Sequence, residues 1–308
     1  MPEATLPRTL AMVSSGADAL TIPGVPQVDS PAAALTPPRH ASEWSAGRVA
    51  VAGVVLIYLV GILVLPLSAL LIETAREGLG AAWEAITSTE AIVALRRSLL
   101  LTAIAVSVNA VVGVAGALVL VRQRFTGRAV LDAVVDLSLA VSPVMIGLAF
   151  LLLIGRDGVA RPVVELLGLR VAFAFPGLVV ATLFVTLPYT IREVAHVLAE
   201  LGTEDEEAAA TLGASRSRTF FRVTLPNVRR GLTTGLTLTA ARSLGEFGAV
   251  LVLGGAIGGR TDTATTFIYT AIEERHAAGA YGMAVLLAFV SILLLVAANL
   301  SRKGSEAS

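Results

Sequence analysis

The sequence contains no cysteine, and only one of its 308 residues is a lysine, Lys303. The absence of cysteine excludes disulfides, thiolate metal sites and a cysteine nucleophile. A Walker A phosphate-binding loop needs a lysine followed by serine or threonine, because this lysine reaches the β- and γ-phosphates of the nucleotide. Gly304 follows Lys303, so the sequence holds no such loop. If the protein uses ATP, another chain must hydrolyse it.

Charged residues are scarce as well. They make up 15% of the chain, against about 25% of an average soluble domain. Hydrophobic residues make up 55%, the mean hydropathy is +0.80, and the formal net charge is zero. The three histidines, His40, His196 and His276, lie too far apart to provide metal-ligand spacing. These features favour an integral membrane protein that itself binds no metal, cofactor or nucleic acid.

Prolines gather at the N-terminus, where seven of the 13 fall within the first 38 residues. Residues 1–46 are also rich in Ala, Ser and Thr, which predicts a disordered tail. The predicted transmembrane domain, residues 47–302, contains six apolar runs long enough to cross about 30 Å of hydrocarbon as helices. They lie near residues 49–72, 98–121, 137–154, 171–191, 232–253 and 280–300. The predicted fold class is therefore an all-α integral membrane protein with about six transmembrane helices.

Loop charges orient these spans. If both termini are cytoplasmic, 14 Lys and Arg residues lie in cytoplasmic segments and 8 lie outside. Positive residues are enriched in cytoplasmic loops, so we expect a multi-pass protein of the bacterial inner membrane with both termini in the cytoplasm. The longest internal loop, about residues 192–231, is then cytoplasmic.

The centre of that loop has the pattern of a short capped helix. Thr203 precedes four acidic residues, and Glu206 stands three positions after it, as a capping box requires. Acids in the first turn favour the helix dipole, and the following alanines are strong helix formers. Gly213 is the expected end, because the residue after a helix is often left-handed. The pattern predicts a helix over residues 204–212.

A second short helix is expected after the glycine. Ser215 or Ser217 is in position to cap it, and Pro226 should end it. Phe220 and Phe221 would be its hydrophobic anchors. Two interpretations of this helix–turn–helix remain. It could be an amphipathic loop that lies on the membrane with its arginines at lipid phosphates. Alternatively, it could be a surface that binds another protein, because the small alanines would let a partner approach closely.

The spacing of the loop resembles the EAA signature of the permease subunits of bacterial ABC importers. That signature reads E-A-A, three residues, G, nine residues, I-x-L-P, and here every interval is kept, with Val223 in place of isoleucine. The resemblance implies the MetI-like fold of type I importers, and a loop that forms coupling helices docked on a separate ATPase subunit, which uses ATP and Mg²⁺. The residues it assigns to coupling are Glu207, Ala208, Ala209, Gly213, Phe220, Phe221, Leu225 and Pro226.

Further stretches look like the sulfate/thiosulfate and molybdate permeases, among them "DLSLAVSPVMIGLAFLLL" and "ARSLGEFGAVLVLGGAIGGRTDT". The C-terminal "IYTAIEERHAAGAYGMAVLLAF" looks most like the CysW-type subunit of the sulfate importer. This resemblance implies a non-catalytic subunit that passes sulfate or thiosulfate, with molybdate or tungstate as the alternative. The implied partners are a homologous CysT-type permease, two ATPase subunits, a periplasmic or lipid-anchored sulfate-binding protein and membrane lipid. Two positions depart from the family pattern: Ser138 replaces a common proline and Arg216 a common aromatic residue.

Arg242, Ser243 and Glu246 lie within the fifth predicted span. Charged residues at membrane depth normally face a cavity or a partner, and Arg242 and Glu246 are four residues apart, so they could pair on one helix face. They either form a packing salt bridge or line an anion path together with Ser142, which precedes a proline in the third span. An ATP-independent secondary anion transporter or channel is the alternative of another class, but no clear inverted repeat supports it.

Two aspartates and three pairs of glycines carry further predictions about local structure. Asp132 and Asp136 are interpreted as partners of a helix N-terminal dipole. Three glycine pairs are expected to permit close helix contacts: Gly113 and Gly116, Gly231 and Gly235, and Gly245 and Gly248.

Overall fold

The computed structural model describes residues 46–306 apart from 167 and 169. The predicted N-terminal tail therefore lies outside the described residues, except for Ala46. Every regular element among the described residues is a helix, and none is a strand, as predicted. The elements are α1 (Ala46–Glu77), α2 (Leu79–Ile86), α3 (Thr89–Arg122), α4 (Arg128–Ala140), α5 (Pro143–Ile154), α6 (Arg161–Leu166), α7 (Phe175–Leu201), α8 (Glu204–Thr211), α9 (Arg216–Thr219), the π-helix η2 (Phe220–Thr224), α10 (Leu225–Asn227), α11 (Arg229–Leu244), α12 (Gly248–Gly254), α13 (Ala264–Glu273) and α14 (Ala277–Glu306).

The helices match the six predicted spans. Four of them, α1, α3, α7 and α14, are each long and apolar enough to cross a membrane. Two further pairs, α4 with α5 and α11 with α12, satisfy the same criteria together but are bent by 119° and 54°. Counting each bent pair once gives up to six spans, so the chain has the helices that the predicted topology requires.

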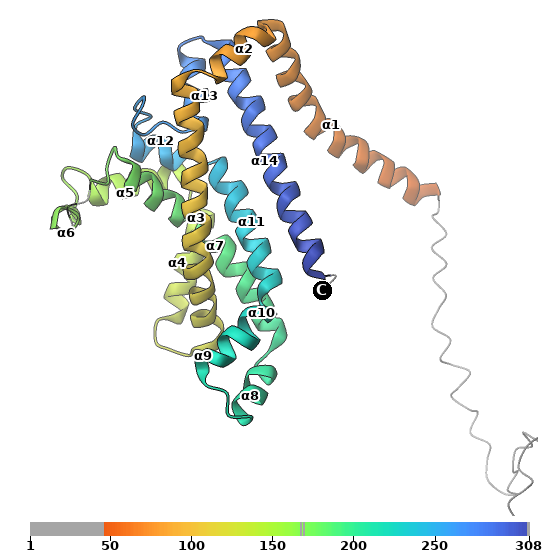
Figure 1. Cartoon of the computed structure of the whole chain (residues 1–308), viewed down its shortest axis with the longest axis vertical. Helices are drawn as coiled ribbons and strands as arrows, with labels where there is room; N and C mark the ends of the chain where they lie inside the picture. Colours follow the sequence, from red (N-terminus) through yellow and green to blue (C-terminus); the bar gives the residue numbers. More distant parts are fainter. Residues whose placement is uncertain (1–45, 167, 169, 307–308) are drawn as a thin grey trace, which may run out of the picture. The chain divides into compact units, whose positions relative to one another are not determined.

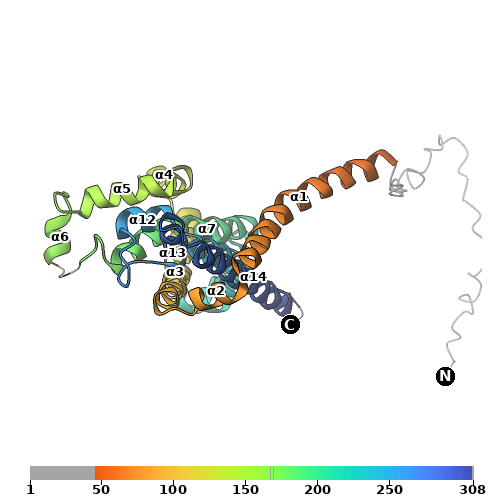
Figure 2. The ribbon, with the colours of Figure 1, turned by 90° about the horizontal axis from the view of Figure 1, so that it is seen from above.

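The chain divides into two compact units, residues 1–58 and 59–308. The described part of the first unit, residues 46–58, is the N-terminal portion of α1. Every site considered below lies in the second unit. There α3, α7 and α11 pack side by side, with α14 beside α11, and α8 to α10 lie at the end of α3 opposite α2 and α13 (Figure 1). Figure 2 shows α4, α5 and α6 to one side of these central helices.

Glycines allow the central helices to approach closely. A Cβ built on Gly113 of α3 would lie 2.5 Å from Thr190 Cγ2 of α7, and one on Gly235 of α11 would lie 2.7 Å from Thr190 Cα. A Cβ on Gly231 would meet Glu193 O of α7 at 2.6 Å. The expectation is confirmed for these glycines, whereas Gly245 has no atom outside its own helix within 4 Å.

The seam between the central helices is polar. Asn109 Nδ2 of α3 donates to Thr186 Oγ1 of α7 at 2.9 Å, and the hydroxyls of Thr190 and Thr239 lie 3.0 Å apart. All four side chains are fully buried. Hydroxyl and amide groups that bond across helices replace the partners that water would provide outside a membrane.

The third predicted span is interrupted at Ser142 and Pro143, because Pro143 begins a new helix that leaves α4 at 119°. Proline favours this first position, since its missing N–H would have had no helical acceptor there. Asp132 and Asp136 lie beyond the first turn of α4, and both bind Arg192 of α7, at 2.7 Å and 2.6 Å. Their partner is thus a guanidinium and not a helix dipole.

Candidate functional site

The predicted cytoplasmic loop is a helix, a glycine turn and a second helical segment. α8 ends at Thr211, and Gly213 follows with φ of +80°. The Gly213 N–H donates to Ala210 O and the Ala214 N–H to Ala209 O, each at 3.0 Å. This is the Schellman motif, in which glycine occupies the left-handed position and satisfies the last carbonyls. The predicted role of Gly213 as the end of α8 is confirmed.

The predicted caps of this loop are wrong. Thr203 has ψ of 1°, outside the extended region that an N-cap side chain needs to reach the first amides. Its hydroxyl donates instead to Glu207 Oε1 at 2.6 Å, so no capping box forms. Ser215 stands at the N-cap position of α9 without a side-chain bond. The second helical segment, from α9 to α10, ends at Asn227, one residue after Pro226, in agreement with the predicted stop.

Two acids of α8 bind side chains from other elements of the protein. Glu206 Oε1 accepts a hydrogen bond from Thr224 Oγ1 at 2.9 Å, and Glu206 Oε2 lies 3.3 Å from Arg122 Nε. Asp205 Oδ2 accepts from Asn227 Nδ2 at 2.9 Å. These contacts hold α8 against the end of α3 and against the η2–α10 segment.

Other residues of the loop face outward. Glu207, Ala208 and Gly213 are exposed and Ala209 is partly exposed. Leu212 is 88% exposed and Phe221 is 65% exposed, and both lie outside the helices that are long and apolar enough to cross a membrane. The loop therefore presents a surface of small, acidic and apolar residues, together with the exposed Arg216, Arg218 and Arg222.

The remaining predicted coupling residues divide between core and surface. Phe220 and Leu225 pack against the apolar cluster of α3, α4 and α7 that includes Val194 and Val228, while Pro226 is exposed. The rings of Phe220 and Phe221 meet edge to face, with centroids 4.9 Å apart. Of the two predicted anchors, only Phe221 is available to a partner.

Arg242 and Glu246 lie at the break between α11 and α12. α11 ends at Leu244, so the two residues do not share one continuous helix as predicted, but Arg242 Nη1 still lies 2.8 Å from Glu246 Oε2. The Glu246 side chain is 0% exposed, and that of Arg242 is 28% exposed. Glu246 Oε1 accepts from the Ala249 N–H at 3.0 Å, which places the carboxylate at the start of α12. The buried carboxylate is thus held by a partly exposed guanidinium and by a helix amide.

The other two predicted path residues differ in environment. Ser243 is buried, and its hydroxyl donates to Thr239 O at 2.8 Å within α11. Ser142 is exposed and precedes α5. The start of α5 touches the start of α12, because a Cβ on Gly248 would lie 3.0 Å from Val144 N. The fold therefore brings the two helix breaks together.

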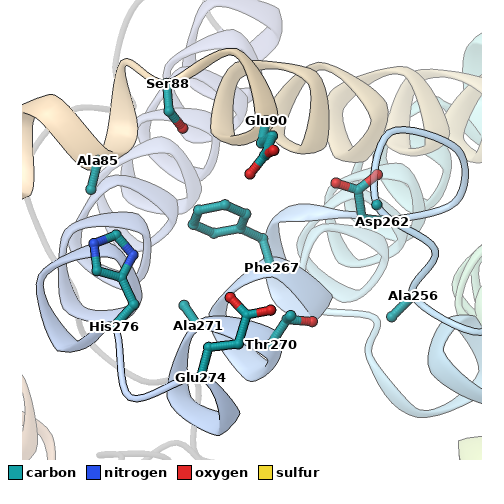
Figure 3. A pocket seen from close by; sticks show the side chains of 11 residues that line it. Ala85, Ser88, Glu90, Ala256, Asp262, Phe267, Thr270, Ala271, Glu274 and His276 are labelled. Atoms are coloured by element: carbon teal, nitrogen blue, oxygen red, sulfur yellow. The ribbon is translucent and has the colours of Figure 1, made fainter.

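A cavity of about 490 Å³ lies at the opposite end of α3 from the loop. Figure 3 shows the carboxyl groups of Glu90, Asp262 and Glu274 around the ring of Phe267. Burial raises the pKa of the Asp262 carboxyl above its ordinary value, against the opposing effect of Arg97, which donates to it. Within the described residues, no group of three or more His, Asp or Glu side chains is placed to hold a metal ion.

The sequence profile of one family matches residues 109–306, a range that includes the loop and both helix breaks. That family is described as the inner membrane component of binding-protein-dependent transport systems. The chain belongs to this family. As an inner membrane transport component it is a multi-pass membrane protein, in agreement with its apolar helices.

Similar proteins place this transport component among permeases. The sulfate transport system permease protein CysW of Synechococcus elongatus is 39% identical over 248 residues, which cover 80% of this chain and 87% of that protein. The CysT protein of the same system in Escherichia coli is 36% identical over 247 residues, covering 80% of this chain and 89% of that protein. A solved bacterial alginate ABC transporter, bound to a periplasmic protein that carries an alginate pentasaccharide, contains a chain with a TM-score of 0.69 at 18% identity, covering 83% of this chain and 94% of that one. That likeness shows a shared fold.

Leu212 and Arg122 of this transport component were not predicted from the sequence. Leu212 is a single large apolar residue in an otherwise polar or small stretch, directly before the helix-ending glycine, and this contrast was a usable signal. Arg122 and Glu206 are 84 positions apart in the sequence, and no local pattern predicts their contact.

Proposed function

We propose that the chain is the permease subunit of an ATP-binding cassette importer that carries sulfate or thiosulfate across the inner membrane. The observation that carries the proposal is its identity of 35–43% with named sulfate permeases, several of which it covers over more than four fifths of their length. The exposed EAA loop, with Gly213 in the left-handed position of its turn, supports coupling to an ATPase.

Separate ATPase subunits would bind and hydrolyse ATP with Mg²⁺, and this chain would supply no bond chemistry. The docked surface would consist of Glu207, the alanines beside it and the exposed Leu212 and Phe221, because an apolar side chain exposed beside small residues can enter a groove of a partner. Closure of the ATPases would move this loop. The remaining partners are a CysT-type permease, a periplasmic or lipid-anchored sulfate-binding protein and membrane lipid.

Arg242 would contact the anion as it passes. Its guanidinium is partly exposed, carries five N–H donors, and is held by a carboxylate that is itself fully covered. Ser142 and Ser243 flank the same pair of helix breaks. Weak contacts of this kind suit a path, because tight binding would trap the oxyanion.

The proposal is tested by reconstituting the chain in vesicles with its permease, ATPase and binding-protein partners and measuring uptake of radiolabelled sulfate. Uptake should require ATP, and unlabelled thiosulfate should compete more strongly than molybdate or tungstate. Uptake that continues without the ATPase would support a secondary transporter instead. Stronger competition by molybdate would move the substrate assignment to that anion.

Coupling is tested in the same vesicles with Glu207→Arg and Gly213→Asp. Both variants should lose co-purification with the ATPase, since the first reverses a charge on the docked surface and the second disturbs the turn. Glu204→Arg is the matched control, because Glu204 is exposed on the same helix but lies outside the signature. ATP-driven uptake that stays intact in both test variants would rule out the coupling role of this loop.

A further inference from the structure

We propose that Arg122, Glu206 and Thr224 form a clamp that makes the end of α3 move with α8, so that the transport achieved per ATP depends on it. The inference rests on the proposed function, because it assumes that α8 receives the movement of an ATPase. It concerns residues outside the EAA signature, apart from Thr224, which occupies its variable position. Arg122 and Glu206 act as positioning residues, since they touch neither nucleotide nor anion.

The carboxylate of Glu206 is the centre of this clamp. One oxygen accepts from Thr224 Oγ1 of η2 at 2.9 Å, and the other lies 3.3 Å from Arg122 Nε in the last turn of α3. The Arg122 guanidinium also donates to Gly202 O, at the connection from α7 to α8. One ion pair therefore joins α3, the start of α8 and the π-helix.

The environment distinguishes this pair from an ordinary surface ion pair. The side chains of Arg122 and Glu206 are only 19% and 25% exposed, whereas those of Arg161 and Glu165 are 45% and 60% exposed. Solvent-exposed pairs contribute little to stability because water screens them. The lower exposure of Arg122 and Glu206, and the hydrogen bonds to Gly202 O and from Thr224, make the clamp a more rigid connection than an exposed ion pair. A cation in the last turn of α3 also complements its helix dipole.

α8 has few other side-chain connections to the protein. None of its residues is buried, and none belongs to an apolar cluster. By contrast, Phe220 and Leu225 hold η2 and α10 to the core. A displacement of α8 consequently reaches the membrane helices through its chain ends, through Asp205 and through the Glu206 clamp.

α3 can carry such a displacement across the molecule. It is one continuous helix of 34 residues, which corresponds to about 50 Å. Near its other end, Arg97 donates to Asp262 and Ser98 Oγ accepts from the Ala264 N–H at 2.8 Å. The same helix thus connects the clamp to the loop before α13.

The test uses the complete reconstituted importer and compares Arg122→Gln, Glu206→Gln and the exposed control Arg161→Gln. We expect all three to co-purify with the ATPase and to hydrolyse ATP like the unmodified protein. Sulfate moved per ATP should fall roughly fivefold in the first two variants, in line with couplings measured at connecting residues, and stay unchanged in the third. The charge exchange Arg122→Glu with Glu206→Arg should restore part of the ratio, because it re-forms the ion pair but not the hydrogen bonds to Gly202 O and from Thr224.

Three outcomes would overturn the clamp. An unchanged ratio in Glu206→Gln, a fall that the charge exchange does not reverse even in part, or an equal fall in Arg161→Gln would each contradict it. If Arg122→Gln fails to accumulate, Glu206→Gln decides, because its amide oxygen can still accept from Thr224. Failure of the unmodified chain to bind an ATPase would instead contradict the proposed function, so the two failures are distinguishable.

Discussion

At the break between α11 and α12, the fold buries the Glu246 carboxylate completely and leaves its partner Arg242 partly exposed. Removing one member of a buried pair strands the other charge, at a cost of about 3 kcal/mol or more. Arg242→Ala should therefore lower the melting temperature of the purified protein and also reduce sulfate uptake. Because stability and transport fall together, the single variant cannot separate a packing role from an anion contact.

The double variant Arg242→Ala with Glu246→Gln separates the two roles. The neutral amide that replaces the carboxylate leaves no stranded charge and can still accept from the Ala249 N–H, so most of the stability should return. If Arg242 contacts the anion, uptake should stay roughly tenfold below that of the unmodified importer, since a hydrogen bond to a charged group contributes about 1.5–3 kcal/mol. Recovery of both stability and uptake would assign Arg242 to packing alone.

Single residues also show where sequence reasoning ends. Gly213 was predictable because its left-handed turn is a local requirement. The capping box at Thr203 and Glu206 failed because Glu206 finds Arg122 and Thr224, which the chain brings to it from elsewhere. A local capping motif does not form when residues from other parts of the chain bind the same polar group.

At the scale of the helices, the close approach of α7 and α11 gives a direct prediction. A methyl group added at Gly235 would lie 2.7 Å from Thr190 Cα, a backbone atom that no side-chain rotation can move. Gly235→Ala should destabilise the protein by about 1–3 kcal/mol, which corresponds to a fall in melting temperature of roughly 5 °C.

Gly245→Ala is the matched control on the same segment. Its Cβ would meet no atom closer than 3.8 Å, and its φ of −89° suits any residue. The melting temperature should stay close to that of the unmodified protein. An equal decrease in both variants would mean that the close packing of α7 and α11 does not depend on Gly235.

Span positions followed from the sequence, whereas the angles of the breaks within them did not. Apolar length is a property of the chain itself, so α1, α3, α7 and α14 were predictable from hydropathy. The 119° bend after α4 and the 54° bend after α11 depend on which helices pack beside them. At the second bend Gly248 rests against Val144 of α5, a contact that residue spacing does not encode.

At the scale of the whole molecule, the orientation of the chain in the membrane can be measured directly. The excess of arginine and lysine on one side predicts that the EAA loop and both termini face the cytoplasm. The absence of cysteine makes this testable without background labelling. Ser217 and Gly258 are both exposed. Ser217 lies in α9 of the loop, and Gly258 lines the same cavity as Glu90, at the opposite end of α3.

Single variants Ser217→Cys and Gly258→Cys should therefore react from opposite sides of the membrane. In cells that have lost their outer membrane but keep a sealed inner membrane, an impermeant maleimide should label Gly258→Cys and not Ser217→Cys. In inside-out vesicles the result should reverse, because the cytoplasmic face is then exposed to the reagent. The unmodified chain, without a thiol, should stay unlabelled in both. Labelling of Ser217→Cys in intact cells would place the loop outside, where no ATPase could reach it, and would contradict both the orientation and the proposed coupling.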